Sequence, residues 1–286
     1  MKPLAYLMLL AVPTLNAQQT PVSATGRGVN FYSTEKEAAL GAQLASEFQR
    51  QNQILDNARV NVYLESLGGR LLKRIPETGF AFHFAAYADS EKSGIHEPRV
   101  LPGGYIYVPE SLILVARDEA EFAGMLAHAV AHAANRDATR QASRAELAQM
   151  ATIPLMMSSG GWAGYAAQQS AGNRIPIAFL AFQRAYEREA DYRAVPMMAG
   201  AGWDPEALAR YIERQQPSAY TAIAAVYSPL PPLEERIAAL RKEIGALALK
   251  DYSTSAEFAA IQAEVRRLNA GQAPRTRPPM LGPPQE

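Results

Sequence analysis

The chain has 286 residues, which is enough for one large or two small domains with a substantial core. Its 28 Lys and Arg residues balance 28 Asp and Glu residues, and no basic cluster indicates binding to nucleic acid or to an anionic membrane. The absence of cysteine excludes disulfides, cysteine-ligated zinc and a cysteine nucleophile.

Residues 1–17 have the pattern of a secretory signal peptide. Lys2 supplies the positive charge, Leu4–Val12 is apolar, and we expect cleavage after Ala17. A short N-terminal anchor helix is the alternative. No later stretch reaches the ~18 apolar residues of a spanning helix. We therefore expect a mature protein in the periplasm or another extracytoplasmic compartment, beginning with a polar leader at residues 18–32.

Two helices are predicted next. Thr34 and Glu37 have the spacing of a capping box, and an apolar face continues to about Gln51. A second apolar periodicity covers residues 60–72, and we expect Pro76 to end that helix.

The periodicity then changes to that of strands. Aromatic residues alternate over Phe80–Ala85, and the Pro102-Gly103-Gly104 turn leads into a short apolar run, Tyr105–Val108. We predict a small antiparallel sheet. The edge of such a sheet can hold a substrate backbone in extended form, although a sheet that only covers a helix is equally compatible with the spacing.

A single helix is predicted over Glu119–Arg140, with Asp118 as its N-cap and Glu121 completing a capping box. His128 and His132 lie four residues apart on it, so both imidazoles point the same way. This is how a helix presents two nitrogens to one zinc ion. An isolated histidine pair is weak support for a metal site.

Ala129 directly follows the first histidine of the HAVAH motif. A zinc peptidase of the HExxH type needs a glutamate there, to take a proton from the attacking water and return it to the leaving amine. Because that glutamate is not a ligand, its loss need not release the metal. It removes acid–base help typically worth ~10²–10⁴ in rate.

A third ligand is predicted on a later helix over Ile175–Ala194. Glu187 can supply a carboxylate oxygen, and Asp191, one turn further on, can accept a hydrogen bond from a ligand histidine. The alternatives are a solvated carboxylate at Glu187 and a surface salt bridge between Asp191 and Arg188.

The remaining segments add helices and one apolar stretch. Ile153–Gly172 could be a mobile hairpin over a cleft, a surface that touches lipid or unfolded chains, or a buried hairpin. Further helices are predicted after Asp204-Pro205, over Leu233–Leu249, and from a Thr254–Glu257 cap to Gly271.

Several motifs in order give a family resemblance over Asn30 to Leu247. They are ESLGGRL, LPGGYIYV, EAEFAGMLAH, HAVAH, EREAD, AGWDP and PPLEERI. Together they resemble the CAAX-prenyl-protease-type zinc metallopeptidases, family forty-eight of the metallopeptidases. The chain looks most like their periplasmic branch, which acts as protease and chaperone in outer-membrane quality control.

The resemblance implies Zn²⁺ bound by His128, His132 and Glu187, with Asp191 supporting a ligand histidine, and it implies peptide-bond hydrolysis. The implied partners are unfolded or misassembled envelope polypeptides and no nucleic acid, with peripheral membrane contact through residues 153–172 as a further expectation.

The implied fold is α+β and mostly helical: a zincin-like metallopeptidase domain with a small antiparallel sheet and a helical C-terminal part. We assign this domain to residues 33–250, a C-terminal helix to 251–271, and a disordered Pro-rich tail to 272–286.

Four positions depart from the family pattern. They are Ala129 at the general base, Glu97-Pro98-Arg99 for Asn-Ala-Phe, Asp137 for a common histidine, and Leu230 for another histidine. Pro98 also removes a backbone donor from the expected substrate-binding edge.

Three hypotheses follow. The first is a zinc-binding family member with weak or lost proteolysis that holds peptides in a chaperone-like way. The second is an active zinc metalloendopeptidase that uses another carboxylate as base, for which Glu97 and Glu189 are the candidates. The third is a structural protein without metal. We expect His83 and His96 to be structural or solvated rather than catalytic.

Overall fold

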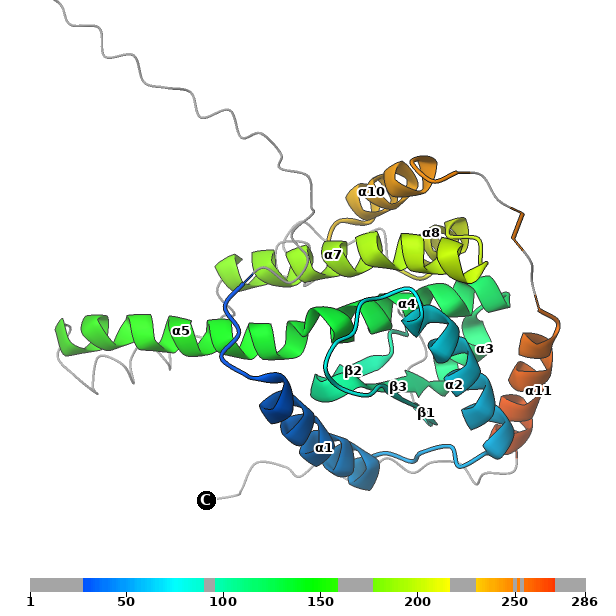
Figure 1. Ribbon diagram of the computed structural model, residues 1–286, viewed down its shortest axis with the longest axis horizontal. Helices are drawn as coiled ribbons and strands as arrows, with labels where there is room; N and C mark the ends of the chain where they lie inside the picture. Colours follow the sequence, from blue (N-terminus) through cyan, green and yellow to red (C-terminus); the bar gives the residue numbers. More distant parts are fainter. Residues whose placement is uncertain are drawn as a thin grey trace, which may run out of the picture.

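The computed structural model describes residues 28–89, 96–158, 177–216, 230–248, 251–252 and 255–270. They form a mostly helical α+β fold with one three-stranded sheet, which confirms the predicted class (Figure 1). None of the helices in these ranges is both long and apolar enough to cross a membrane.

The helices are α1 (Thr34–Gln51), α2 (Ala58–Leu72), η1 (Pro102–Gly104), α3 (Glu110–Val115), α4 (Glu119–Asn135), α5 (Asp137–Ser158), α7 (Ile177–Ala201), α8 (Glu206–Gln215), α10 (Leu233–Gly245) and α11 (Glu257–Ala270).

Helix α4 lies at the centre, with α7 along one side and the sheet on the other (Figure 1). Its N-cap, Asp118, and two residues of its first turn, Glu119 and Glu121, are acidic, as the positive end of a helix dipole favours. The Asp118 carboxylate accepts the Glu121 N–H at 2.8 Å, the predicted N-cap. The buried Glu119 carboxylate accepts hydrogen bonds from the Tyr63 hydroxyl and the Trp203 indole, both at 3.0 Å. These bonds fix α4 against α2 and against the turn that follows α7.

The prediction of one helix through Arg140 is wrong, because α4 ends at Asn135. Arg136 adopts the left-handed conformation (φ 59°, ψ 37°), which costs a residue other than glycine roughly 1–2 kcal/mol. Its guanidinium binds the buried Glu37 carboxylate at 2.5 Å and the Tyr32 carbonyl at 2.6 Å. This ion pair, in which the Glu37 carboxylate is buried, stabilises the break between α4 and α5.

The predicted Thr34–Glu37 capping box is also wrong. The N-cap of α1 is Ser33, whose hydroxyl accepts the Lys36 N–H at 3.3 Å. Glu37 does not fold back onto the helix start, because its carboxylate turns inward to Arg136 and to the Thr139 hydroxyl.

The sheet is mixed, so the prediction of an antiparallel sheet is wrong for one of its two pairings. Strand β1 (His83–Tyr87) is parallel to the central strand β3 (Tyr105–Pro109), and β2 (Arg99–Leu101) is antiparallel to β3. The chain reverses once before β2 and once at η1, so β3 runs in the direction of β1. Within the described part of the chain, one edge of β2 has no strand beside it, in the order β1-β3-β2.

Two helix boundaries differ from the predicted ones. α7 continues to Ala201 although Ala194 was the expected end, because Pro196 is accommodated inside it. Proline has no backbone N–H, so the carbonyl of Tyr192, four residues earlier, receives no helical hydrogen bond from it. Tyr192 is exposed, so water can reach this part of the helix. α10 ends at Gly245 rather than near Leu249.

Helix α11 joins the main core through Phe258, Ile261 and Val265. The Ser255 hydroxyl accepts the Glu257 N–H at 3.0 Å at its start. Some predicted features lie outside the described residues: Thr254, Gly271, residues 1–17 and residues 272–286. Most of Ile153–Gly172 also lies outside them, although α5 includes its first part, through Ser158.

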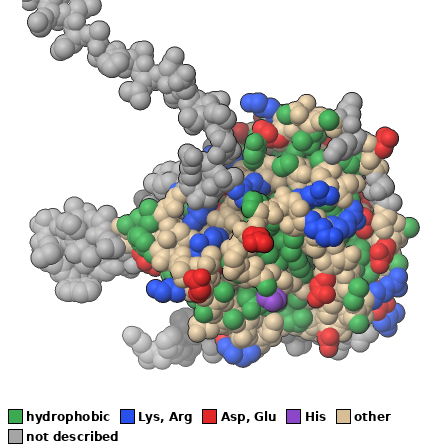
Figure 2. All heavy atoms as spheres, viewed as in Figure 1, with side chains coloured by type: hydrophobic (Ala, Val, Ile, Leu, Met, Phe, Trp, Pro, Cys, Tyr) green, Lys and Arg blue, Asp and Glu red, His purple; other side chains and the backbone are tan. Residues whose placement is uncertain are grey.

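On the face shown in Figure 2, basic and acidic side chains are interspersed. This face therefore offers no broad surface of a single sign to a nucleic acid.

Candidate metal centre

The structure brings His128, His132 and Glu187 together. Their donor atoms all lie within 4.8 Å of one another, the one such group of three among the described residues. The two Nε2 atoms are 3.0 Å apart. Glu187 Oε2 lies 3.5 Å from His128 Nε2, and Oε1 lies 3.6 Å from His132 Nε2. Helix α4 supplies both imidazoles and α7 supplies the carboxylate.

These distances fit zinc. Two nitrogens at ~2.0–2.1 Å from a tetrahedral zinc lie roughly 3.3 Å apart, and a nitrogen and a carboxylate oxygen lie roughly 3.4 Å apart. Glu187 Oε2 is buried and has no hydrogen-bond partner among the described residues, so a cation would complete its contacts. Two histidines and one carboxylate form a donor set of the kind used by zinc peptidases, which leaves a fourth position open.

Each histidine is oriented by a separate carboxylate. Asp191 Oδ1 lies 2.9 Å from His128 Nδ1, and Asp137 Oδ2 lies 2.7 Å from His132 Nδ1. Such partners fix the tautomer and leave Nε2 for a metal. On a continuous helix, the Asp137 side chain would point about 140° away from that of His132. The break at Arg136 allows Asp137 to face His132 instead. From the sequence, Asp137 was identified only as a departure from the family pattern. The spacing of residues along the chain did not indicate that it contacts His132.

A buried arginine from α10 completes the centre. Arg236 Nε and Nη2 donate to Asp191 at 2.6 and 2.9 Å, and Nη1 donates to Gln216 Oε1 at 3.2 Å. Its Nη2 also lies 3.7 Å from Glu187 Oε2. Asp191 therefore pairs with Arg236 and not with Arg188, the surface alternative. Arg236 lies in the PPLEERI motif, but nothing in the motif alone indicated its role.

The electrostatics of the centre favour a cation. Burial disfavours the protonated form of His128 and by itself would lower the pKa of this residue. The nearby carboxylates of Asp191 and Glu187 outweigh that effect and raise the pKa of His128 to about 10. Burial also opposes ionisation of Glu187, yet the close approach of His128 at 3.5 Å and the charges of His132 and Arg236 lower the pKa of Glu187 to about 2. The metal-free centre thus retains a proton where a divalent cation would bind.

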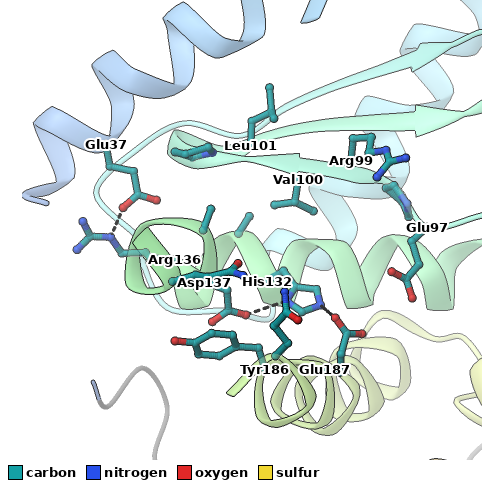
Figure 3. A pocket seen from close by; sticks show the side chains of 16 residues that line it. Glu37, Glu97, Arg99, Val100, Leu101, His132, Arg136, Asp137, Tyr186 and Glu187 are labelled. Carbon is teal, nitrogen blue, oxygen red and sulfur yellow. Dashed lines mark hydrogen bonds and ion pairs between the residues drawn. The ribbon is translucent and has the colours of Figure 1, made fainter. Parts of the chain in front are cut away.

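A pocket of about 360 Å³ opens beside this centre (Figure 3). One wall is the β2 segment with Glu97 and Pro98 before it, and the opposite wall comes from α4, α5 and α7. His132 and Glu187 line the pocket together with Tyr186. Strand β2 presents its unpaired edge at this wall, so an extended peptide lying there would pass the candidate ligands.

The remaining candidate residues lie apart from the metal group. Ala129 is buried on α4 between the ligand positions. Glu189 is buried 3.6 Å from Arg140. His83 stacks on Tyr105, and neither it nor the buried His96 belongs to the group of donors. Leu230 packs against the apolar core.

Comparison with known proteins identifies the family of this chain. The model of peptidase family M48 matches residues 76–244, more than half of the chain. This chain therefore belongs to peptidase family M48, a class of metallopeptidases, and the resemblance stated from its motifs is confirmed.

Individual relatives are more distant. The chain is 24% identical over 208 residues to the beta-barrel assembly-enhancing protease of Escherichia coli strain K12, covering 70% of this chain and 41% of that protein. It is 26% identical over 218 residues to a Vibrio cholerae protein whose name assigns it to the same class, covering 72% and 44%. A protease HtpX homolog of Syntrophobacter fumaroxidans is 29% identical over 157 residues, covering 42% and 56%. The chain spans less than half of the first two proteins.

Proposed function

We propose that this protein is a zinc-binding, extracytoplasmic member of peptidase family M48 that holds extended segments of unfolded or misassembled envelope polypeptides. Its peptide-bond hydrolysis is much weaker than that of relatives with a glutamate at position 129. The observation that carries the proposal is the pocket that joins the free edge of β2 to His132 and Glu187. The names of the relatives in two bacteria support a role in the assembly of envelope proteins.

Binding would use the sheet edge. An extended peptide can add to β2 through main-chain hydrogen bonds, although Pro98 withholds one donor just before the strand. His128, His132 and Glu187 would hold the zinc, and Asp191 and Asp137 would keep both imidazoles in position. Zinc bound there would lower the pKa of a water and polarise the peptide carbonyl. Ala129 offers no group that could accept the proton of that water.

The location follows from the predicted signal peptide at residues 1–17. The expected contact of residues 153–172 with a membrane surface stays a prediction.

Filling the pocket should weaken peptide binding. Ala138 lines it on α5 and is not one of the candidate metal donors. We expect Ala138→Trp to weaken the binding of a fluorescently labelled unfolded polypeptide at least tenfold, about 1.4 kcal/mol. Fluorescence anisotropy of the zinc-loaded protein would measure it.

The matched control is Ala58→Trp, which places the same indole at an exposed position on α2. It should bind like the wild type. Equal binding by both variants, with both folded, would show that polypeptides do not use this pocket and would reject the proposed function.

A further inference from the structure

Glu97 brings a second acidic group to the candidate metal centre. It lines the same pocket as His132 and Glu187, and Figure 3 shows its carboxyl end directed away from the sheet toward the side where Glu187 lies. Its Oε1 is buried without a hydrogen-bond partner among the described residues, although 32% of the side chain is exposed. The nearest charged partner is Arg236, whose Nη1 lies 3.9 Å from Oε1.

Glu97 is close to the metal group without belonging to it. Arg236 Nη2 lies 3.7 Å from Glu187 Oε2, so one guanidinium faces both carboxylates through its two terminal nitrogens. Glu97 nevertheless falls outside the set of donors that lie within 4.8 Å of one another. Glu97 and Glu187 line the same pocket of about 360 Å³. A carboxylate on the wall of this pocket can contact a water in it without being a metal ligand.

The other carboxylate candidate is less suited to proton transfer. Glu189 is buried beside Arg140 and does not line the pocket. Position 129 carries only a methyl group. Four acidic side chains among the described residues line this pocket: Glu37, Glu97, Asp137 and Glu187. Asp137 is held by His132 and Arg140, Glu37 is held by Arg136, and Glu187 is assigned to the metal, which leaves Glu97.

We propose that Glu97 is the proton acceptor for the residual hydrolysis, in place of the missing glutamate at position 129. This inference rests on the proposed function. The water oxygen forms a bond to the peptide carbonyl carbon while one water proton passes to a Glu97 carboxylate oxygen. The C–N bond then breaks, and the same proton passes to the leaving nitrogen. The products are a carboxylic acid and an amine, which together contain the elements of one water.

A double-mutant cycle between positions 97 and 129 tests this role. Glu97→Gln keeps the size of the side chain and removes its basicity. In the wild-type background it should lower zinc-dependent cleavage of an unfolded polypeptide by about 10²-fold, the lower end of general-base contributions. In the Ala129→Glu background it should change cleavage by less than about threefold, because the new glutamate accepts the proton. Zinc content should equal that of the wild type in all four proteins.

Glu65→Gln is the matched control, since it removes one carboxylate from an exposed position on α2. It should leave cleavage unchanged. The inference is overturned if Glu97→Gln cleaves like the wild type, if it loses the same factor in both backgrounds, or if it loses zinc, which would make Glu97 a ligand. It is also overturned if wild-type cleavage does not exceed that of His128→Ala. Absence of zinc from the wild type would reject the proposed function itself.

Discussion

Ala129→Glu should raise zinc-dependent cleavage of an unfolded polypeptide by up to about 10²-fold over the wild type, because general acid–base help is worth ~10²–10⁴ in total and about 10² of it is assigned to Glu97. The substitution places a carboxylate next to His128 on α4, the position that supplies the general base in peptidases with an HExxH motif. The ligand side chains are unchanged, so the gain would come from proton transfer alone. Release of labelled peptide fragments, with and without a chelator, measures it.

Ala129→Gln is the control for size. Ala129 is buried, so both substitutions must be accommodated in the core, and circular dichroism should establish that both variants are folded. Only the glutamate can move a proton. A folded, zinc-loaded Ala129→Glu protein with no more activity than Ala129→Gln would mean that the other departures, such as Pro98 at the sheet edge, have closed the site to productive substrates.

Arg236→Met should lower the free energy of unfolding by about 3–5 kcal/mol, since it leaves a buried carboxylate without its partner. The Arg236 side chain is fully buried and donates two hydrogen bonds to Asp191. Methionine has a similar length and keeps the packing, so the lost interaction is mainly electrostatic. Urea unfolding of the metal-free protein, followed by circular dichroism, would measure the change.

Arg241→Met on the same helix is the comparison. Arg241 is 46% exposed and pairs with Glu206 and Glu213 at 2.9 and 3.0 Å. Ion pairs with that exposure are worth about 0–1 kcal/mol. If the two variants were equally stable, Arg236 would not be the counter-charge that holds Asp191 beside His128.

The positions that meet at the centre could be predicted from local periodicity and motif order. Spacing of four residues places His128 and His132 on one face of a helix whatever lies around it. The same spacing places Glu187 and Asp191 on one face of α7. The family resemblance then pairs the two helices, and the structure brings these four side chains together.

The rest depends on contacts between distant parts of the chain. The break at Arg136 needs Glu37, 99 residues earlier, to hold a left-handed residue that is not glycine. Because no glycine or proline marks this break, the periodic pattern predicts a continuous helix. The contact of Asp137 with His132 follows from that break and was missed for the same reason. Arg236 reaches Asp191 across 45 residues.

The sheet illustrates a second limit. Alternation predicts that residues form strands but carries no information on their relative direction. The parallel pairing of β1 with β3 follows from the insertion of β2 between them in the chain.

The central claim is that His128, His132 and Glu187 bind zinc. Metal analysis of the purified protein, wild type beside His128→Ala and loaded under zinc-replete conditions, tests it most directly. We expect about one zinc per chain in the wild type and none in the variant, because two remaining donors are too few for a stable site. Equal zinc content in the two proteins, or no zinc in either, would contradict this account of the centre.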